Sequence, residues 1–262
     1  MPFINVNNQK IFYFDNRLEG IPLVFIHGWL GTSLEWRYQL FHFNFKNHII
    51  LLDLPGFGKS DKPNEDYSIE FFTNQLLDFV RLLGYKEIIL VGHSLGGLIA
   101  QNIAFNTPNL VKKLILISST SNIFQSIRER FIVFWVNILF KLFYKSSLKN
   151  IIGKIISPEV EIREFNKLYN STLKLPKMVV LSTFKNMTYK YKIKKNLFTI
   201  SQPTLLIFGS NDKIISKSNI NELNKFIPNS ELLVIENGSH RTMYNNYSRV
   251  NEAIERFIQN KI

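Results

Sequence analysis

The sequence predicts an α/β fold, a mostly parallel and doubly wound sheet with a helical cap inserted after one strand. Short apolar runs alternate with longer helix-compatible stretches, as in sheets that carry helices on both faces. Most of these runs are rich in Leu and β-branched residues without polar alternation, as expected of strands covered on both faces. The alternation breaks once, over a long segment that contains no strand candidate.

A hairpin and six strands can be placed along the chain. Residues 4–14, "INVNNQKIFYF", predict an antiparallel hairpin that turns at Asn7 and Asn8. The six apolar runs that we expect to form strands are 22–28, 48–56, 87–94, 113–119, 203–210 and 231–239. The helices of the core are expected at 68–83, 95–106, 217–226 and 247–260.

The segment from residue 121 to residue 195 is expected to consist of helices rich in Phe, Tyr and Ile. The spacing of one helix face is followed by Phe131, Phe134, Trp135, Ile138 and Leu142. We therefore expect residues 1–120 and 196–262 to form the core, and residues 121–195 to form a helical cap over the sheet.

The positive charge of the chain is concentrated in this cap. The net charge is +12, and residues 121–200 contain 15 Lys and Arg against 4 Glu, whereas the remainder contains 17 against 16 Asp and Glu. Drift toward lysine in a chain rich in Lys, Asn and Ile would explain this excess. A basic face for an anionic partner, either an acidic carrier protein or an anionic membrane surface, would explain it equally well. The lysines are not interleaved into a nucleic-acid motif, so no nucleic-acid partner is expected.

Several classes of protein are excluded by what the sequence lacks. The chain has no cysteine, which excludes disulfides, thiolate metal sites and a cysteine nucleophile. The N-terminal residues do not combine a basic region with an apolar core, so we expect no secretory signal and a cytoplasmic location. The longest apolar run, 131–144, is interrupted by Asn137 and Lys141 and is shorter than the roughly 20 residues of a membrane-spanning helix.

A candidate nucleophile lies in the stretch "IILVGHSLGGLIAQ", residues 88–101. Gly92, Ser94 and Gly96 form a Gly-x-Ser-x-Gly pattern between a strand candidate and a helix candidate. A sharp strand-to-helix turn projects the serine hydroxyl above the sheet, and glycines at these positions avoid collisions across the turn. Ser94 as a simple helix N-cap would account for the serine but not for the glycines.

A serine nucleophile needs a base, which is itself oriented by an acid. His240 is the only histidine after Ser94, and Asp212 is the only aspartate. Both follow strand candidates, and the carboxyl ends of parallel strands are where an open sheet places its ligands. Glutamates of the cap remain an alternative acid, although they lie in a less suitable element.

The oxyanion of an acyl-transfer reaction needs two preorganised donors. We expect these to be the main-chain N–H of Leu95 and that of Trp29, with Gly28 allowing a sharp turn in "FIHGWLG". His27 and His93 each lie beside a glycine and are interpreted as structural or pocket-lining. The predicted substrate-binding residues are Trp29, His93, Phe131 and Trp135.

The segments "HGW", "DLPGFGKSDKP", "GHSLGG", "PTLLIFGSND" and "GSH" together resemble the α/β-hydrolase superfamily, in particular its capped, cofactor-free serine esterases. The resemblance covers about residues 1–120 and 196–262. It implies a triad of Ser94, Asp212 and His240 with oxyanion donors Leu95 and Trp29, and no cofactor or metal. Serine at position 94, in place of aspartate, argues against the haloalkane dehalogenases and epoxide hydrolases of the family. The loop after His240 lacks the proline and glutamate that are common there.

The expected activity is hydrolysis of a carboxylic ester or thioester with an apolar acyl part, through an acyl-enzyme. The substrate would be a small-molecule ester or an acyl group on an acidic carrier, since "HGW" and "GHSLGG" also resemble pimeloyl-carrier-protein methyl esterases. The alternatives are a lipase or monoacylglycerol-type hydrolase at a membrane surface, a C–C bond hydrolase and a non-catalytic binding protein.

Overall fold

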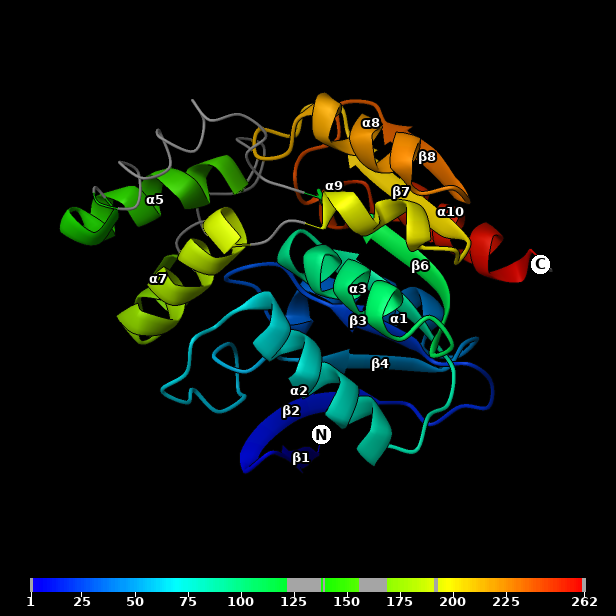
Figure 1. The fold of residues 1–262 in the computed structure, drawn as a ribbon, viewed down its shortest axis with the longest axis horizontal. Coiled ribbons are helices and arrows are strands. Elements are labelled where there is room, and N and C mark those ends of the chain that lie inside the picture. Colours follow the sequence, from blue (N-terminus) through cyan, green and yellow to red (C-terminus); the bar gives the residue numbers. More distant parts are fainter. Residues whose placement is uncertain (1, 122–137, 139, 156–168, 191–192, 261–262) are drawn as a thin grey trace.

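The computed structural model describes residues 2–121, 138, 140–155, 169–190 and 193–260. They form an eight-stranded sheet between layers of helices (Figure 1). The strands, in their order across the sheet, are β1 (Phe3–Val6), β2 (Gln9–Asp15), β4 (Ile49–Leu52), β3 (Leu23–Ile26), β5 (Ile88–His93), β6 (Val111–Ile117), β7 (Thr204–Gly209) and β8 (Ser230–Ile235). β2 runs antiparallel to both of its neighbours, and all other neighbouring strands are parallel. The predicted fold class, a mostly parallel sheet, is confirmed.

The hairpin that opens the chain turns where the sequence predicts. Val6 pairs with Gln9, and the two residues between them, Asn7 and Asn8, have φ values of 49° and 62°. Two consecutive left-handed residues match the twist of the two strands, and asparagine tolerates that conformation better than most residues.

The central strands are buried on both faces, which explains their unbroken apolar sequences. In β3, Leu23 and Phe25 belong to one hydrophobic cluster, whereas Val24 and Ile26 belong to the other. The first cluster also includes side chains of α1 (Arg37–Phe43) and α10 (Tyr247–Gln259). The second includes side chains of the helices α2 (Ile69–Leu82), α3 (Leu95–Asn106) and α8 (Lys217–Phe226). The sheet is therefore doubly wound.

The sequence prediction missed three short helical segments that border the site. A 3₁₀ turn, Ser33–Trp36, leads directly into α1, and α9 (Thr242–Asn245) precedes α10. These segments are stabilised by tertiary packing, because Trp36, Phe43 and Met243 are each fully buried against the sheet. Helices this short are marginal on their own, so their periodicity gives little signal.

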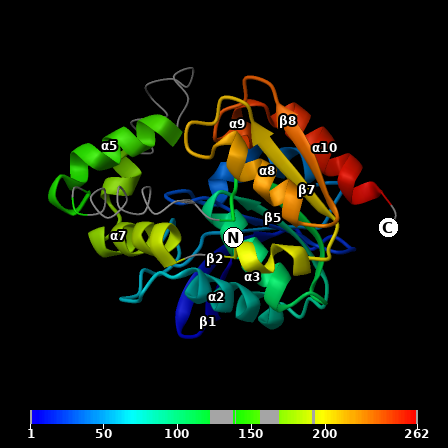
Figure 2. The same ribbon diagram turned by 45° about the horizontal axis from the view of Figure 1, so that its top comes forward.

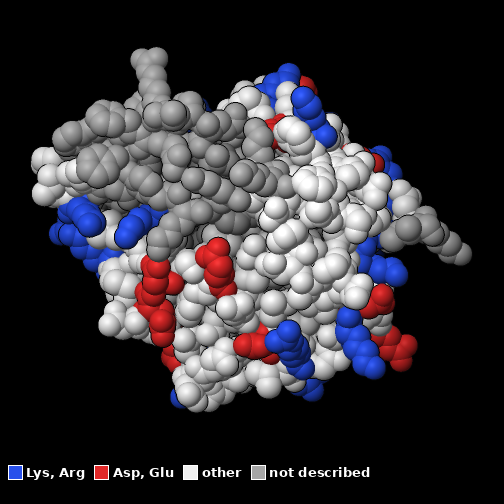
Figure 3. All heavy atoms as spheres, viewed as in Figure 1, with Lys and Arg blue, Asp and Glu red and all other residues white. Residues whose placement is uncertain are grey.

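In the cap segment the structure describes the helices α5 (Tyr144–Ile155) and α7 (Lys177–Lys185), which lie beside the layered core in both views (Figures 1 and 2). No strand occurs in the described part of residues 121–195. None of the helices in the described parts of the chain is both long and apolar enough to cross a bilayer. Lys and Arg side chains gather at the edge that α5 and α7 form (Figure 3).

The predicted apolar stripe of the cap is wrong at its C-terminal end. Leu142 is 70% exposed, whereas Phe140 is 1% exposed and packs against Trp29 and Phe184. The buried face therefore contains Phe140, two residues from the predicted position. Residues 131, 134 and 135 lie outside the described residues.

Candidate active site

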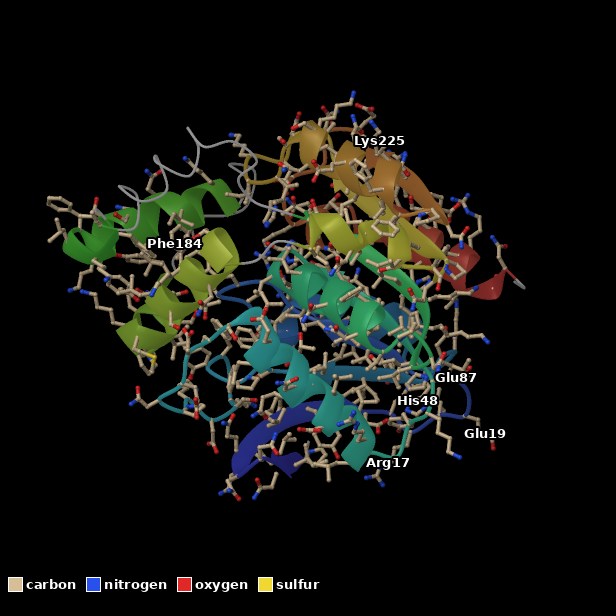
Figure 4. The ribbon with its side chains drawn as sticks, viewed as in Figure 1. Arg17, Glu19, His48, Glu87, Phe184 and Lys225 are labelled. Carbon is tan, nitrogen blue, oxygen red and sulfur yellow. The ribbon has the colours of Figure 1, made fainter. Side chains whose placement is uncertain are left out.

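A cavity of about 490 Å³ lies between the sheet and the described cap helices. Its lining includes residues that follow five parallel strands: Trp29 after β3, Ser94 after β5, Ser119 after β6, Lys213 after β7 and His240 after β8. Ile151 of α5 and Phe184 of α7 also line it. Figure 4 shows Phe184 on α7, far from the labelled His48 at the other side of the molecule. The cavity therefore lies at the carboxyl edge of the sheet, where parallel sheets bind their ligands.

Ser94 occupies a strained turn between β5 and α3. Its φ of 51° and ψ of −113° lie in a region that costs a non-glycine residue on the order of 1–3 kcal/mol. Neighbouring glycines make the turn sterically feasible: a Cβ on Gly92 would collide with the main-chain oxygen of Gly96, and one on Gly96 with that of Ile26. This geometry suits a nucleophile better than a helix cap, and the Ser94 side chain makes no capping hydrogen bond.

Two polar side chains that the sequence did not single out, Ser119 and Gln101, form hydrogen bonds that hold this turn. Ser119 Oγ donates a hydrogen bond to the main-chain oxygen of Ser94 at 3.1 Å. Gln101 Nε2 in turn donates to Ser119 Oγ at 3.3 Å and to the oxygen of Gly97 at 3.1 Å. Gln101 is a buried residue of α3 and Ser119 follows β6, and no sequence motif marks either residue for this role.

The structure brings Asp212 and His240 into direct contact, although 28 residues separate them. His240 Nδ1 lies 2.9 Å from Asp212 Oδ2 and 3.1 Å from Oδ1, and both side chains are almost completely buried. Asp212 Oδ1 also accepts hydrogen bonds from the main-chain N–H groups of Ile214 and Ile215.

Burial alone would raise the pKa of Asp212, but the His240 imidazole and these N–H groups outweigh it and lower the pKa below the ordinary value. Asp212 therefore remains a carboxylate that accepts the Nδ1 proton of His240. This arrangement leaves Nε2 as the basic nitrogen.

Ser94 and His240 line the same cavity, but among the described residues no hydrogen bond joins the hydroxyl to the imidazole. Such bonds are often long in unliganded enzymes and shorten when substrate binds. The alternative acids, the four glutamates of the cap, lie outside the described residues.

The two expected oxyanion donors also border the cavity. Leu95 is the first residue of α3, so its N–H has no partner within that helix, and Trp29 follows β3. The turn differs from the expectation, because the left-handed residue is Leu30, with φ 66°, and not Gly28. Glycine is needed at position 28 for another reason: a Cβ there would lie 2.7 Å from His93 Nδ1.

The two glycine-flanked histidines have different surroundings. His27 Nδ1 donates to the oxygen of Gly28, while Nε2 accepts from the N–H of Leu54. Burial lowers the pKa of His27, which agrees with a neutral ring in a structural role. His93 borders the cavity, and its Nε2 donates to the main-chain oxygen of His240 at 2.9 Å.

Glu35, which the sequence reasoning did not single out, completes this arrangement. Its Oε1 lies 2.9 Å from His93 Nδ1, and its Oε2 accepts a hydrogen bond from the N–H of Gly28 at 2.9 Å. Because both ring nitrogens of His93 face acceptors, neither is free for a substrate. His93 was predicted to bind substrate; in this arrangement it can contact a substrate only through the face of its ring.

Trp29 presents its side chain to the cavity as well as its main chain. The indole packs against the rings of Phe140 and Phe184, and the buried Nε1 has no hydrogen-bond partner. Buried donors without a partner are uncommon in folded proteins. The other predicted binding residues, Phe131 and Trp135, lie outside the described residues.

Within the described ranges, no group of three or more His, Asp and Glu side chains has an arrangement that could hold a metal ion.

Comparison with known proteins decides the family. The family model described as "alpha/beta hydrolase fold" matches residues 21–247. The chain belongs to the α/β-hydrolase fold family. Among its relatives, epoxide hydrolase 1 of Caenorhabditis elegans is 25% identical over 98% of this chain and 69% of its own length.

Two solved α/β-hydrolase structures illustrate the likeness in three dimensions. Est816, described as an N-acyl homoserine lactone degrading enzyme, is 26% identical with a TM-score of 0.87, over 98% of this chain and 100% of its own. The esterase EaEST of Exiguobacterium antarcticum is 21% identical with a TM-score of 0.89, over 98% and 99%. Hydrolysis is thus the class of activity that the family and its members support.

Proposed function

We propose that this α/β hydrolase cleaves carboxylic esters or thioesters with an apolar acyl part, using Ser94, His240 and Asp212. The observation that carries the proposal is the contact between His240 and Asp212 in the cavity that also exposes Ser94. Several apolar side chains line that cavity, namely Trp29, Leu98, Ile151, Phe184 and Met187. They offer an acyl chain a surface that excludes water.

The reaction follows from this geometry. His240 Nε2 takes the proton of the Ser94 hydroxyl as Oγ attacks the ester carbonyl, and the Nδ1 proton stays on the hydrogen bond to Asp212. The N–H groups of Leu95 and Trp29 stabilise the oxyanion. His240 then donates its proton to the leaving alcohol or thiol, and the acyl group remains on Ser94.

Water completes the cycle. His240 Nε2 removes a proton from a water molecule as the water oxygen attacks the acyl carbonyl. Collapse of the second tetrahedral intermediate returns the proton to Ser94 and releases a carboxylic acid. An acyl-enzyme therefore exists on Ser94 between the two steps.

The relatives support this choice of reaction to different degrees. The name of Est816 refers to lactones, which are cyclic esters open to the same attack. The name of the nematode relative refers to epoxides, but the turn after β5 in this chain presents a serine, whose attack on an ester yields an acyl group that water can remove. We therefore favour esters over epoxides.

The basic edge of α5 and α7 favours a second substrate form, an acyl group on an acidic carrier (Figure 3). α5 alone contains Lys145, Lys149 and Lys154. If this edge docks a carrier, activity on the carrier-bound substrate should fall with ionic strength, while activity on a small neutral ester should not. Equal responses to salt would contradict the carrier proposal.

The triad is tested by substitution. Ser94→Ala is expected to lower turnover of 4-nitrophenyl butyrate by at least about 1,000-fold, as loss of a triad nucleophile does elsewhere. The matched control is Ser248→Ala, which removes an exposed hydroxyl from α10. Wild-type turnover by a folded Ser94→Ala variant would contradict the proposal.

A further inference from the structure

One carboxylate of the core holds the cap helix α7 in place. Asp66 belongs to the loop of residues 53–68, which connects β4 to α2 and lies beside α7 in both views (Figures 1 and 2). Asp66 Oδ1 accepts hydrogen bonds from Ser182 Oγ at 3.0 Å and from Asn186 Nδ2. Ser182 and Asn186 are four residues apart, so they lie on one face of the helix. These three residues form a clamp that ties two successive turns of α7 to the core.

Further contacts join the same face of α7 to this loop. Ser182 Oγ accepts a hydrogen bond from the main-chain N–H of Tyr67 at 3.0 Å. Val179, three residues before Ser182, shares its face of the helix and is fully buried. A Cβ on Gly56 would lie 2.8 Å from Cγ1 of Val179, so the helix and the loop meet there without space for a side chain. The clamp therefore lies beside a close apolar contact.

The opposite face of α7 forms a wall of the cavity. Phe184 lies two residues from both Ser182 and Asn186, and side chains two residues apart point about 200° apart around a helix. Phe184 and Met187 line the cavity. The Phe184 ring also packs against the indole of Trp29, with ring centroids 5.2 Å apart. The clamp and the cavity wall are thus two sides of one helix, and a shift of α7 at the clamp would move the wall.

The apolar wall suits the acyl chain of the substrate. A binding surface that is held in place before the substrate arrives loses less conformational freedom on binding. We propose that Asp66 is a positioning residue for the acyl chain, because its clamp holds Phe184 and Met187 where a long chain contacts them. An acyl group too short to reach this wall does not depend on the clamp. This inference rests on the proposed ester hydrolysis and names a determinant of its chain-length specificity.

Two 4-nitrophenyl esters, the acetate and the octanoate, test the inference because they differ only in the length of the acyl chain. Asp66→Ala should raise KM for the octanoate by about 3- to 10-fold, the effect of losing one intramolecular hydrogen bond. KM for the acetate, and kcat for both esters, should change by less than about twofold. A general loss of folded protein would instead lower the apparent kcat of both esters by the same factor.

Three further variants separate the clamp from the charge of Asp66. Asp66→Asn keeps an oxygen that can accept from both donors, so it should retain the wild-type KM for the octanoate. Ser182→Ala should raise this KM as Asp66→Ala does, and the double variant should show little further increase because both substitutions break the same contact. Glu65→Ala removes the neighbouring exposed carboxylate and should leave the KM unchanged.

The outcomes distinguish this inference from the proposed function. An unchanged KM for the octanoate in Asp66→Ala, or equal changes of KM for the two esters, would overturn the inference while ester hydrolysis stands. An Asp66→Asn variant that behaves like Asp66→Ala would also overturn it. Hydrolysis of neither ester by the wild type would overturn the proposed function, and this inference with it.

Discussion

The carboxylate of Glu35 lies 2.9 Å from Nδ1 of His93, and this buried pair joins two loops of the candidate active site. The second Glu35 oxygen accepts the N–H of Gly28, next to Trp29, and His93 Nε2 donates to the oxygen of His240. Burial would raise the pKa of Glu35, but the nearby His93 imidazole outweighs it and lowers the pKa to about 2. The contact between the Glu35 carboxylate and the His93 ring thus links the loop that carries Trp29 to the loop that carries His240.

Removing the charge of Glu35 should disturb catalysis without touching the nucleophile. In Glu35→Gln, Nδ1 of His93 loses the carboxylate beside it, so the loops of Trp29 and His240 lose a common support. We expect kcat for 4-nitrophenyl butyrate to fall by about 10- to 100-fold, with a smaller change in KM, because small misplacements of catalytic groups have effects of this size. Glu255→Gln, which removes a partly exposed carboxylate paired with His42 and Lys46, is the control. An unchanged kcat in folded Glu35→Gln would show that the pair does not position the site.

The same pair predicts how stability depends on acid. The folded-state pKa of Glu35 is about 2, below its ordinary value of 4.5, so its ionised form stabilises the fold. That contribution is complete above pH 4.5 and is lost as the pH falls from 4.5 toward 2. Urea unfolding across this window should show a steeper loss of stability for the wild type than for Glu35→Gln. Parallel pH profiles for the two proteins would contradict this assignment.

Lys113 is expected to stabilise the C-terminal helix. Its Nζ donates to three main-chain oxygens at the end of α10, those of Phe257, Ile258 and Asn260. Burial lowers the pKa of Lys113, yet the ammonium group neutralises the negative end of the helix.

Lys113→Met should therefore reduce the free energy of unfolding by about 1–3 kcal/mol, the cost of leaving buried acceptors unsatisfied. The neighbouring Lys112 pairs with Glu87 at the surface, and Lys112→Met should change stability by less than about 0.5 kcal/mol. Urea denaturation measures both, and equal effects would contradict the capping role.

The sequence predicted the sheet and the major helices because these elements repeat a strong local signal. The apolar runs of β3, β4, β5 and β7, and that of β6 after Lys113, reflect burial on both faces, and α2 and α10 show helical periodicity over three or more turns. The pairing of Asp212 with His240 was also foreseeable, since each was the only residue of its type after Ser94.

Glu35 and Lys113 were not foreseeable, because their roles depend on partners distant in the chain. A glutamate next to Trp36 in a short 3₁₀ turn resembles a surface residue, and its burial follows from contact with His93, 58 positions later. Lys113 lies in a strand whose first residues alternate, and its partners are more than 140 residues away. Leu142 shows the opposite kind of error. Its spacing from the other apolar residues predicted that it lies on the buried face of a helix, but the structure buries Phe140 instead and leaves Leu142 exposed.

The central claim is that Ser94 carries the acyl group, and active-site labelling tests it most directly. Wild-type protein treated with a fluorophosphonate should gain one adduct, which peptide mass spectrometry should place on Ser94, and the Ser94→Ala variant should gain none. An adduct on another residue, or ester hydrolysis by an enzyme that the probe neither labels nor inhibits, would contradict the account.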